Sequence, residues 1–148
     1  MKTAARLALP LVAAAMVACG SVPQSGGQTV GKITYSVSGG IAGWQRTLTI
    51  EQDGTARIEV VRGPSPGATD KQVDPAILQR LHHLVSDPAF AALQREYLPT
   101  PGGADLQDYV VTAEVDGKTI QTMTRDGAAV PQILRDVLTI LNDILRAA

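Results

Sequence analysis

One serine of the chain has the flanking glycines of a nucleophile elbow. The residues Gly63-Pro64-Ser65-Pro66-Gly67 match the pattern G-x-S-x-G, in which a tight strand-to-helix turn exposes the serine hydroxyl for acyl transfer. Two prolines beside Ser65 do not fit that turn, and the next helix start lies only at Asp74. We therefore interpret the segment as a rigid surface loop and assign no catalytic role to Ser65.

The chain has two histidines, His82 and His83, which are consecutive. Neighbouring residues on a helix point about 100° apart, whereas two histidines that share a zinc ion on a helix lie at positions i and i+4. No third ligand with zinc-site spacing accompanies them. We expect neither histidine to bind a metal.

The acidic residues mostly occupy positions that turns and helix starts explain. Asp105 and Asp108 lie close together near a predicted loop, and paired carboxylates can serve as general acid and base. An acidic pair at spacing i, i+3 beside a strand start is nevertheless common without catalytic meaning. We expect no catalytic residue, no cofactor and no enzymatic activity.

A glycine-rich turn gives the best indication of binding. The segment Ser38-Gly39-Gly40-Ile41-Ala42-Gly43 lacks the spacing G-x-G-x-x-G and does not open onto a helix, so it does not predict a phosphate site. Ile41 and Trp44 place apolar side chains at or near its tip. A rigid aromatic residue on such a loop is typical of the anchors of protein interfaces.

The N-terminus has the layout of an export signal. Lys2 and Arg6 precede an apolar stretch of 12 residues, 7–18, that contains Pro10. A helix needs about 20 apolar residues to cross the hydrocarbon core, so this stretch is too short for a permanent anchor. We predict that residues 1–18 are a cleaved signal peptide.

The tetrad Met16-Val17-Ala18-Cys19 resembles the bacterial lipobox, in which the cysteine is acylated and becomes the first mature residue. Cys19 is the single cysteine of the chain, so it has no disulfide partner within the chain. The alternative is an ordinary cleaved signal followed by a free cysteine. The resemblance implies a lipid anchor in the cell membrane or the outer membrane, on the extracytoplasmic face.

Length and charge limit the remaining possibilities. A chain of 148 residues with a formal net charge of −1 and no cluster of Lys or Arg gives no electrostatic footprint for nucleic acid. Residues 19–29 are rich in Gly, Ser and Gln, which predicts a flexible tether. We expect one domain, residues 30–148.

Alternating apolar residues predict the strands of that domain. Residues 33–37, 44–50 and 56–60 alternate, and Asp53-Gly54 predicts a type I′ hairpin turn with positive φ at both residues. Residues 109–115 and 118–125 form a second hairpin around Asp116-Gly117.

Two Asp-Pro pairs and one apolar stripe predict three helices. Asp74-Pro75 and Asp87-Pro88 each place an N-cap before a proline at the first helical position. An apolar stripe from residue 133 to 145 predicts the last helix, after Pro131. The order β-β-β-α-α-β-β-α favours an α+β fold, with an antiparallel sheet of about five strands and helices on one face.

The order of these motifs resembles the emfourin family, small protein inhibitors of thermolysin-like zinc metallopeptidases of the protealysin type. The resemblance covers roughly residues 32–146. It rests on the turn at residues 38–43, Asp87 with Phe90 and Leu93, Leu98-Pro99 with the loop to Asp105, Tyr109, and Asp126-Gly127 followed by Pro131 and the last helix.

The resemblance implies a lipid-anchored inhibitor whose partner is a secreted or envelope thermolysin-like metallopeptidase. Preorganised loops are the expected contacts, because a rigid binder loses less entropy on association. The candidate residues are Gly39, Gly40, Ile41, Ala42, Gly43 and Trp44 in the first loop, and Pro99, Thr100, Pro101, Gly102 and Gly103 in the second. The alternative is an envelope lipoprotein that binds another protein or a ligand without inhibiting an enzyme.

Overall fold

The computed structural model describes residues 27–147. The predicted signal peptide, Cys19 and the tether as far as residue 26 therefore lie outside the described residues. Among the residues from 27 to 147, no helix is both long and apolar enough to cross a membrane.

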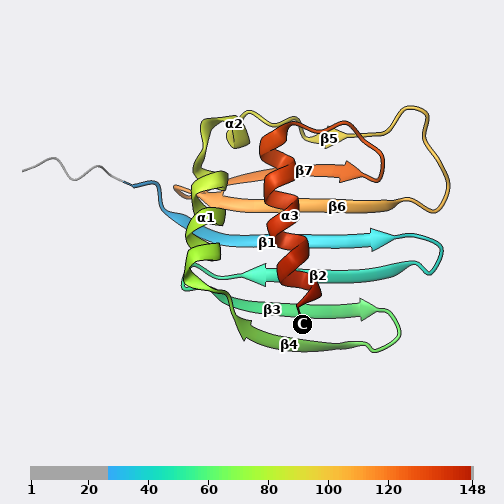
Figure 1. The fold of residues 1–148 in the computed structure, drawn as a ribbon, viewed down its shortest axis with the longest axis horizontal. Helices are drawn as coiled ribbons and strands as arrows, with labels where there is room; N and C mark the ends of the chain where they lie inside the picture. Colours follow the sequence, from blue (N-terminus) through green and yellow to red (C-terminus); the bar gives the residue numbers. More distant parts are fainter. Residues whose placement is uncertain (1–26, 148) are drawn as a thin grey trace, which may run out of the picture.

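A single sheet of seven strands forms the body of the molecule, in the order β4-β3-β2-β1-β6-β7-β5 (Figure 1). Neighbouring strands are antiparallel, except that β5 runs parallel to β7. The strands are β1 (Val30–Gly39), β2 (Trp44–Ile50), β3 (Thr55–Arg62), β4 (Gly67–Gln72), β5 (Glu96–Tyr97), β6 (Gln107–Val115) and β7 (Lys118–Arg125).

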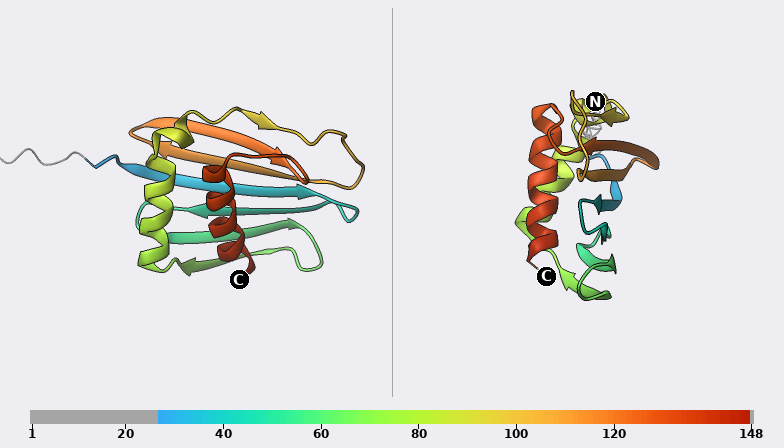
Figure 2. Two further views of the ribbon diagram at one scale, coloured as in Figure 1. Left: turned by 45° about the horizontal axis from the view of Figure 1, so that its top comes forward. Right: turned by 90° about the vertical axis from the view of Figure 1, so that its right-hand side faces the viewer.

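Three helices lie on one face of this sheet, as the end-on view in Figure 2 shows. They are α1 (Pro75–Ser86), α2 (Pro88–Ala91) and α3 (Gln132–Arg146). Helix α1 lies across one end of the sheet and α3 across its middle (Figure 1). The predicted α+β class is confirmed.

The expected number of strands, about five, is wrong because β4 and β5 were not predicted. The β4 sequence Gly-Ala-Thr-Asp-Lys-Gln has no apolar alternation, and most of its residues are exposed. Its backbone pairs with β3 along the edge of the sheet, and Asp70 forms an ion pair with Arg57 at 3.2 Å. Strand β5 has two residues, which is too short for a periodic pattern.

The two Asp-Gly hairpin turns differ. Asp116 and Gly117 have φ of 50° and 73° and join paired residues Val115 and Lys118, as predicted for a type I′ turn. At the other turn only Gly54 has positive φ, and four residues separate β2 from β3. Asp53 instead accepts a hydrogen bond from the Thr55 amide at 2.9 Å, so the predicted two-residue turn is wrong there.

Both predicted helix starts are confirmed. The Asp74 carboxylate accepts hydrogen bonds from the amides of Ala76 and Ile77 at 2.8 and 3.3 Å, and Asp87 accepts one from Ala89 at 2.7 Å. Each cap satisfies an amide that has no partner within its helix. The bend between α1 and α2 places Phe90 fully within the core.

Helix α3 supplies the largest helical part of the core. Its buried residues are Leu134, Val137, Ile140, Leu141, Ile144 and Leu145. They face the inward side chains of the sheet, among which Ile33, Tyr35, Leu48 and Val111 are fully buried. The apolar stripe read from the sequence therefore identifies the face that packs on the sheet.

We expect Leu141→Ala to lower the free energy of unfolding by about 2–5 kcal/mol, because it leaves a cavity beneath the centre of α3. Thr139→Ala on the exposed side of the same helix is the matched control, with an expected change within about 0.5 kcal/mol. Urea unfolding followed by circular dichroism measures both. Equal stability of the two variants would contradict this packing.

Candidate binding surface at the loop end of the sheet

Four connections lie at the same end of the sheet, away from α1 (Figure 1). They are residues 40–43 between β1 and β2, 63–66 between β3 and β4, 98–106 between β5 and β6, and 126–131 between β7 and α3. We call this region the loop end. Both candidate binding segments from the sequence belong to it.

The glycine-rich loop at residues 40–43 has a defined backbone. Gly39, Gly40 and Gly43 have φ of 103°, 71° and 57°, a region that side chains disfavour. The Gly43 amide donates a hydrogen bond to the Gly40 carbonyl oxygen at 2.9 Å and closes a tight turn. At its tip the Ile41 side chain is 88% exposed, while Trp44 at the start of β2 is 41% exposed.

The second candidate loop supports the first. The Gly40 amide donates to the Leu106 carbonyl oxygen at 3.2 Å. A Cβ on Gly39 would lie only 2.6 Å from that same oxygen, so only glycine allows this approach. The structure thus brings the segments around Gly39 and Leu106 together, although 67 positions separate these two residues in the sequence.

Asp126 stabilises the start of β6, beside which the two candidate loops meet. Its carboxylate accepts hydrogen bonds from the Gln107 amide at 2.9 Å and from the Tyr109 hydroxyl at 2.6 Å, while its own amide donates to the Gln107 carbonyl oxygen at 3.0 Å. Burial, followed by the hydrogen bond and negative charge of Asp126, raises the pKa of Tyr109 to about 12. The Tyr109 hydroxyl therefore stays protonated and remains a donor at neutral pH.

Two stacked tyrosines continue this network to α3. The rings of Tyr109 and Tyr35 lie 6.5 Å apart between centroids, at an interplanar angle of 9°. The Tyr35 hydroxyl donates to the side chain of Asn142 on α3 at 2.9 Å. Asp126 and Asn142 were not singled out as site residues from the sequence, because a contact between distant elements leaves no local pattern.

The remaining candidate residues lie on the exposed part of the 98–106 connection. Thr100, Pro101, Gly102 and Gly103 are exposed, whereas Pro99 is half-buried. The Thr100–Pro101 peptide bond is cis. Leu98 adds an exposed apolar side chain at the start of this connection, so the loop end carries apolar surface on both of its candidate segments.

The residues considered for catalysis do not converge. Ser65 lies between two strands rather than before a helix, so the nucleophile elbow is not formed. Asp108 pairs with Arg125 at 2.6 Å, while Asp105 is exposed.

The two histidines differ in their environment. His82 Nε2 is buried with no hydrogen-bond partner within residues 27–147, and burial lowers the pKa of this imidazole, whereas His83 is exposed. In the described part of the chain, no three His, Cys, Asp or Glu residues gather as metal ligands.

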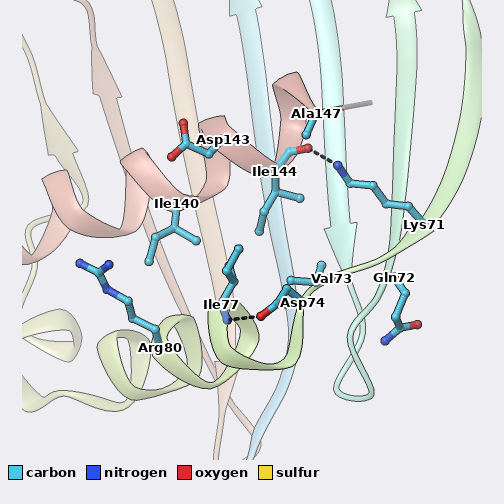
Figure 3. Close-up of a pocket in the computed structure, with 10 residues that line it drawn as sticks. All are labelled: Lys71, Gln72, Val73, Asp74, Ile77, Arg80, Ile140, Asp143, Ile144 and Ala147. Carbon is cyan, nitrogen blue, oxygen red and sulfur yellow. Dashed lines mark hydrogen bonds between the residues drawn. The ribbon is translucent and has the colours of Figure 1, made fainter.

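A cavity of about 570 Å³ lies at the opposite end, between α1, α3 and β4 (Figure 3). Its walls include Ile77, Ile140 and Ile144. Two of its polar groups already serve helix ends, because Asp74 caps α1 and Lys71 Nζ donates to the Ile144 carbonyl oxygen at 2.5 Å. The cavity therefore offers chiefly apolar contact.

The chain matches no protein-family model, and no curated protein matches it significantly. The likeness to the emfourins therefore stays a prediction from the order of the motifs, and the loop end is the structural feature against which it can be tested.

We expect Gly39→Ala to lower the free energy of unfolding by about 1–3 kcal/mol, because the backbone is left-handed there and the Leu106 carbonyl blocks the new methyl group. Gly102→Ala is the matched control, since a Cβ there meets no atom within 4 Å. Urea unfolding measures the stability, and amide NMR shifts of Gly40 and Leu106 report the loop contact. A Gly39→Ala variant with unchanged stability and shifts would contradict the close approach.

Proposed function

We propose that the domain is a protein inhibitor of a thermolysin-like zinc metallopeptidase and blocks the cleft of that enzyme with its loop end. The observation that carries the proposal is Ile41, an apolar side chain that is 88% exposed on a loop with a fixed backbone. An apolar side chain held at the tip of a rigid loop can enter a pocket of a partner and act as an anchor of the interface. The resemblance to the emfourins supplies the class of partner.

Rigidity supports inhibition because it limits the entropy lost on binding. The left-handed glycines and the hydrogen bond from Gly40 to Leu106 hold the first loop before any partner is present. The 98–106 connection supports this loop from the side, and its exposed apolar residue Leu98 enlarges the contact. Interfaces of this kind concentrate their affinity in a few buried anchors, and Ile41 is our first anchor.

The same backbone favours inhibition over cleavage. Peptides commonly bind proteins by adding an extended strand, whereas Gly40 and Gly43 have φ of 71° and 57° around a closed turn. A turn of this shape fills a cleft without presenting an extended peptide bond to the catalytic groups. Catalytic zinc sites keep one coordination position open for water or substrate, and steric occlusion beside that position is sufficient to exclude substrate. Occlusion of this kind needs no metal, cofactor or catalytic residue on the inhibitor itself.

We also propose that Cys19 carries the lipid anchor and that the domain acts outside the cytoplasmic membrane. The supporting observations are the basic start, the short apolar stretch and the small residues before Cys19 in the sequence. Two or more acyl chains hold a protein stably on a bilayer. An inhibitor in that position meets secreted or envelope peptidases.

The cavity beside Ile77 favours a second candidate function, in which an envelope lipoprotein binds an apolar ligand without inhibiting an enzyme. Its volume of about 570 Å³ is in the range of small-molecule sites. Titration of the domain with a fluorescent fatty acid tests this function. Saturable binding that Ile77→Asp abolishes, together with no inhibition of any peptidase, would favour it over the first proposal.

We expect Ile41→Ala to raise the inhibition constant at least about 30-fold, since truncation of an interface anchor costs about 2 kcal/mol or more. Ile77→Ala is the matched control, because Ile77 is also an exposed isoleucine, at 43%, but lies beside α3 at the other end of the domain. The measurement is residual activity of a panel of thermolysin-like peptidases on a short peptide substrate after preincubation with residues 27–148. Equal inhibition by both variants would place the contact elsewhere, and no inhibition by the folded, intact wild-type domain would refute the function.

We expect Cys19→Ala to abolish acylation of the full-length chain, because the thiol is the site of the lipid. Mass spectrometry of the mature N-terminus and fractionation of membranes from soluble protein are the measurements. A lipidated N-terminus in the variant, or an unlipidated one in the wild type expressed in a bacterium, would refute the anchor.

A further inference from the structure

A small hollow lies beside the first candidate loop, on the same face of the sheet as the helices. Its volume is about 200 Å³, and we call it the Trp44 hollow. It is lined by Trp44, Arg46, Val60, Arg62, Gly63, Pro64 and Ser65. Trp44 is the one tryptophan of the chain.

The hollow contains two guanidinium groups with no carboxylate partner in the described part of the chain. Arg46 and Arg62 take part in no ion pair or side-chain hydrogen bond among residues 27–147, whereas Arg57 and Arg125 on the opposite face pair with Asp70 and Asp108. Positive charge at this place is therefore left uncompensated within the domain.

The hollow is continuous with the candidate loop. A Cβ on Gly43 would lie 3.6 Å from Nη1 of Arg62, so this guanidinium lies against the turn that presents Ile41. Trp44 belongs to both features, because it follows the loop and forms a wall of the hollow. A partner that contacts Ile41 will therefore also meet Arg62 and Trp44.

We propose that the Trp44 hollow binds an aspartate or glutamate side chain of the target peptidase, located next to its cleft. This inference rests on the proposed inhibitory function. A guanidinium presents parallel N–H donors that match a carboxylate, and the pair strengthens where apolar groups exclude water. Val60, Pro64 and the Trp44 ring supply such apolar walls.

The size and charge of the hollow favour a protein carboxylate over other anions. Small-molecule sites usually occupy about 300–1,000 Å³, and this hollow, at about 200 Å³, suits a single side chain. Nucleic acids are bound by extended basic surfaces, whereas this chain has a formal net charge of −1. The hollow could also select among peptidases. A peptidase with a basic residue beside its cleft would be repelled by Arg46 and Arg62, whereas one with an acidic residue there would be attracted.

The test compares two variants of the domain, residues 27–148, on a peptidase that the wild type inhibits. In one variant Arg46→Gln and Arg62→Gln are combined. The control is Arg80→Gln, which removes one positive charge from an exposed arginine that takes part in no ion pair within the described residues, at the far end of the domain. Association and dissociation rates are measured at low and high NaCl concentration, with thermal melting to verify folding.

We expect the double variant to raise the inhibition constant roughly 10- to 100-fold at low salt and to weaken the salt dependence of the association rate. Arg80→Gln should change neither by more than about twofold. The single variant Arg62→Lys should keep only part of the wild-type affinity, because lysine keeps the charge but not the paired donors.

Unchanged inhibition and salt dependence in the double variant would overturn the carboxylate site and leave the inhibitory function in place. An equal effect of Arg80→Gln would overturn it as well, because net charge rather than the hollow would then be responsible. A wild-type domain that inhibits no peptidase would refute the proposed function, and the carboxylate site with it.

Discussion

The pairing of β1 with β6 holds the two halves of this fold together. Strand β1 forms hydrogen bonds with β2 on one side and with β6 on the other, so a hairpin from the start of the domain and one from its end share a single sheet. Gly39 pairs with both Trp44 and Gln107. The first candidate loop therefore lies directly beside the residues that precede β6, and its shape depends on a contact between chain segments that are far apart in sequence.

The same region shows how polar groups can stabilise a loop from within the protein. Asp126 satisfies an amide and a hydroxyl on β6, and the stacked tyrosines continue this contact to Asn142 on α3. A buried network stabilises only when its members are satisfied. Here the backbone of the loop is fixed by groups behind it. Ile41, Trp44 and the guanidinium groups of Arg46 and Arg62, which are unpaired among residues 27–147, remain on the surface.

Local chemistry in the sequence was enough to predict much of the fold. Asp74 and Asp87 cap their helices, and the apolar stripe of α3 faces the sheet, because capping and periodicity act within a few residues. Strand β4 could not be predicted, since an exposed edge strand is held by backbone pairing and needs no apolar side chains. The turn at Asp53 differed because its carboxylate bonds to the Thr55 amide. Both candidate loops were identified separately, but their contact, the Asp126 network and the Trp44 hollow depend on tertiary packing.

The direction of β1 has a consequence for an anchored molecule. This strand begins at Val30 near α1 and ends at Gly39 in the loop end (Figure 1). Its 10 residues span about 33 Å. If Cys19 holds the chain on a bilayer, the tether joins the domain at the end remote from the Gly40–Gly43 turn. The proposed binding surface would then lie at the end of the domain farther from the point where the tether is attached, so the tether would not lie across it.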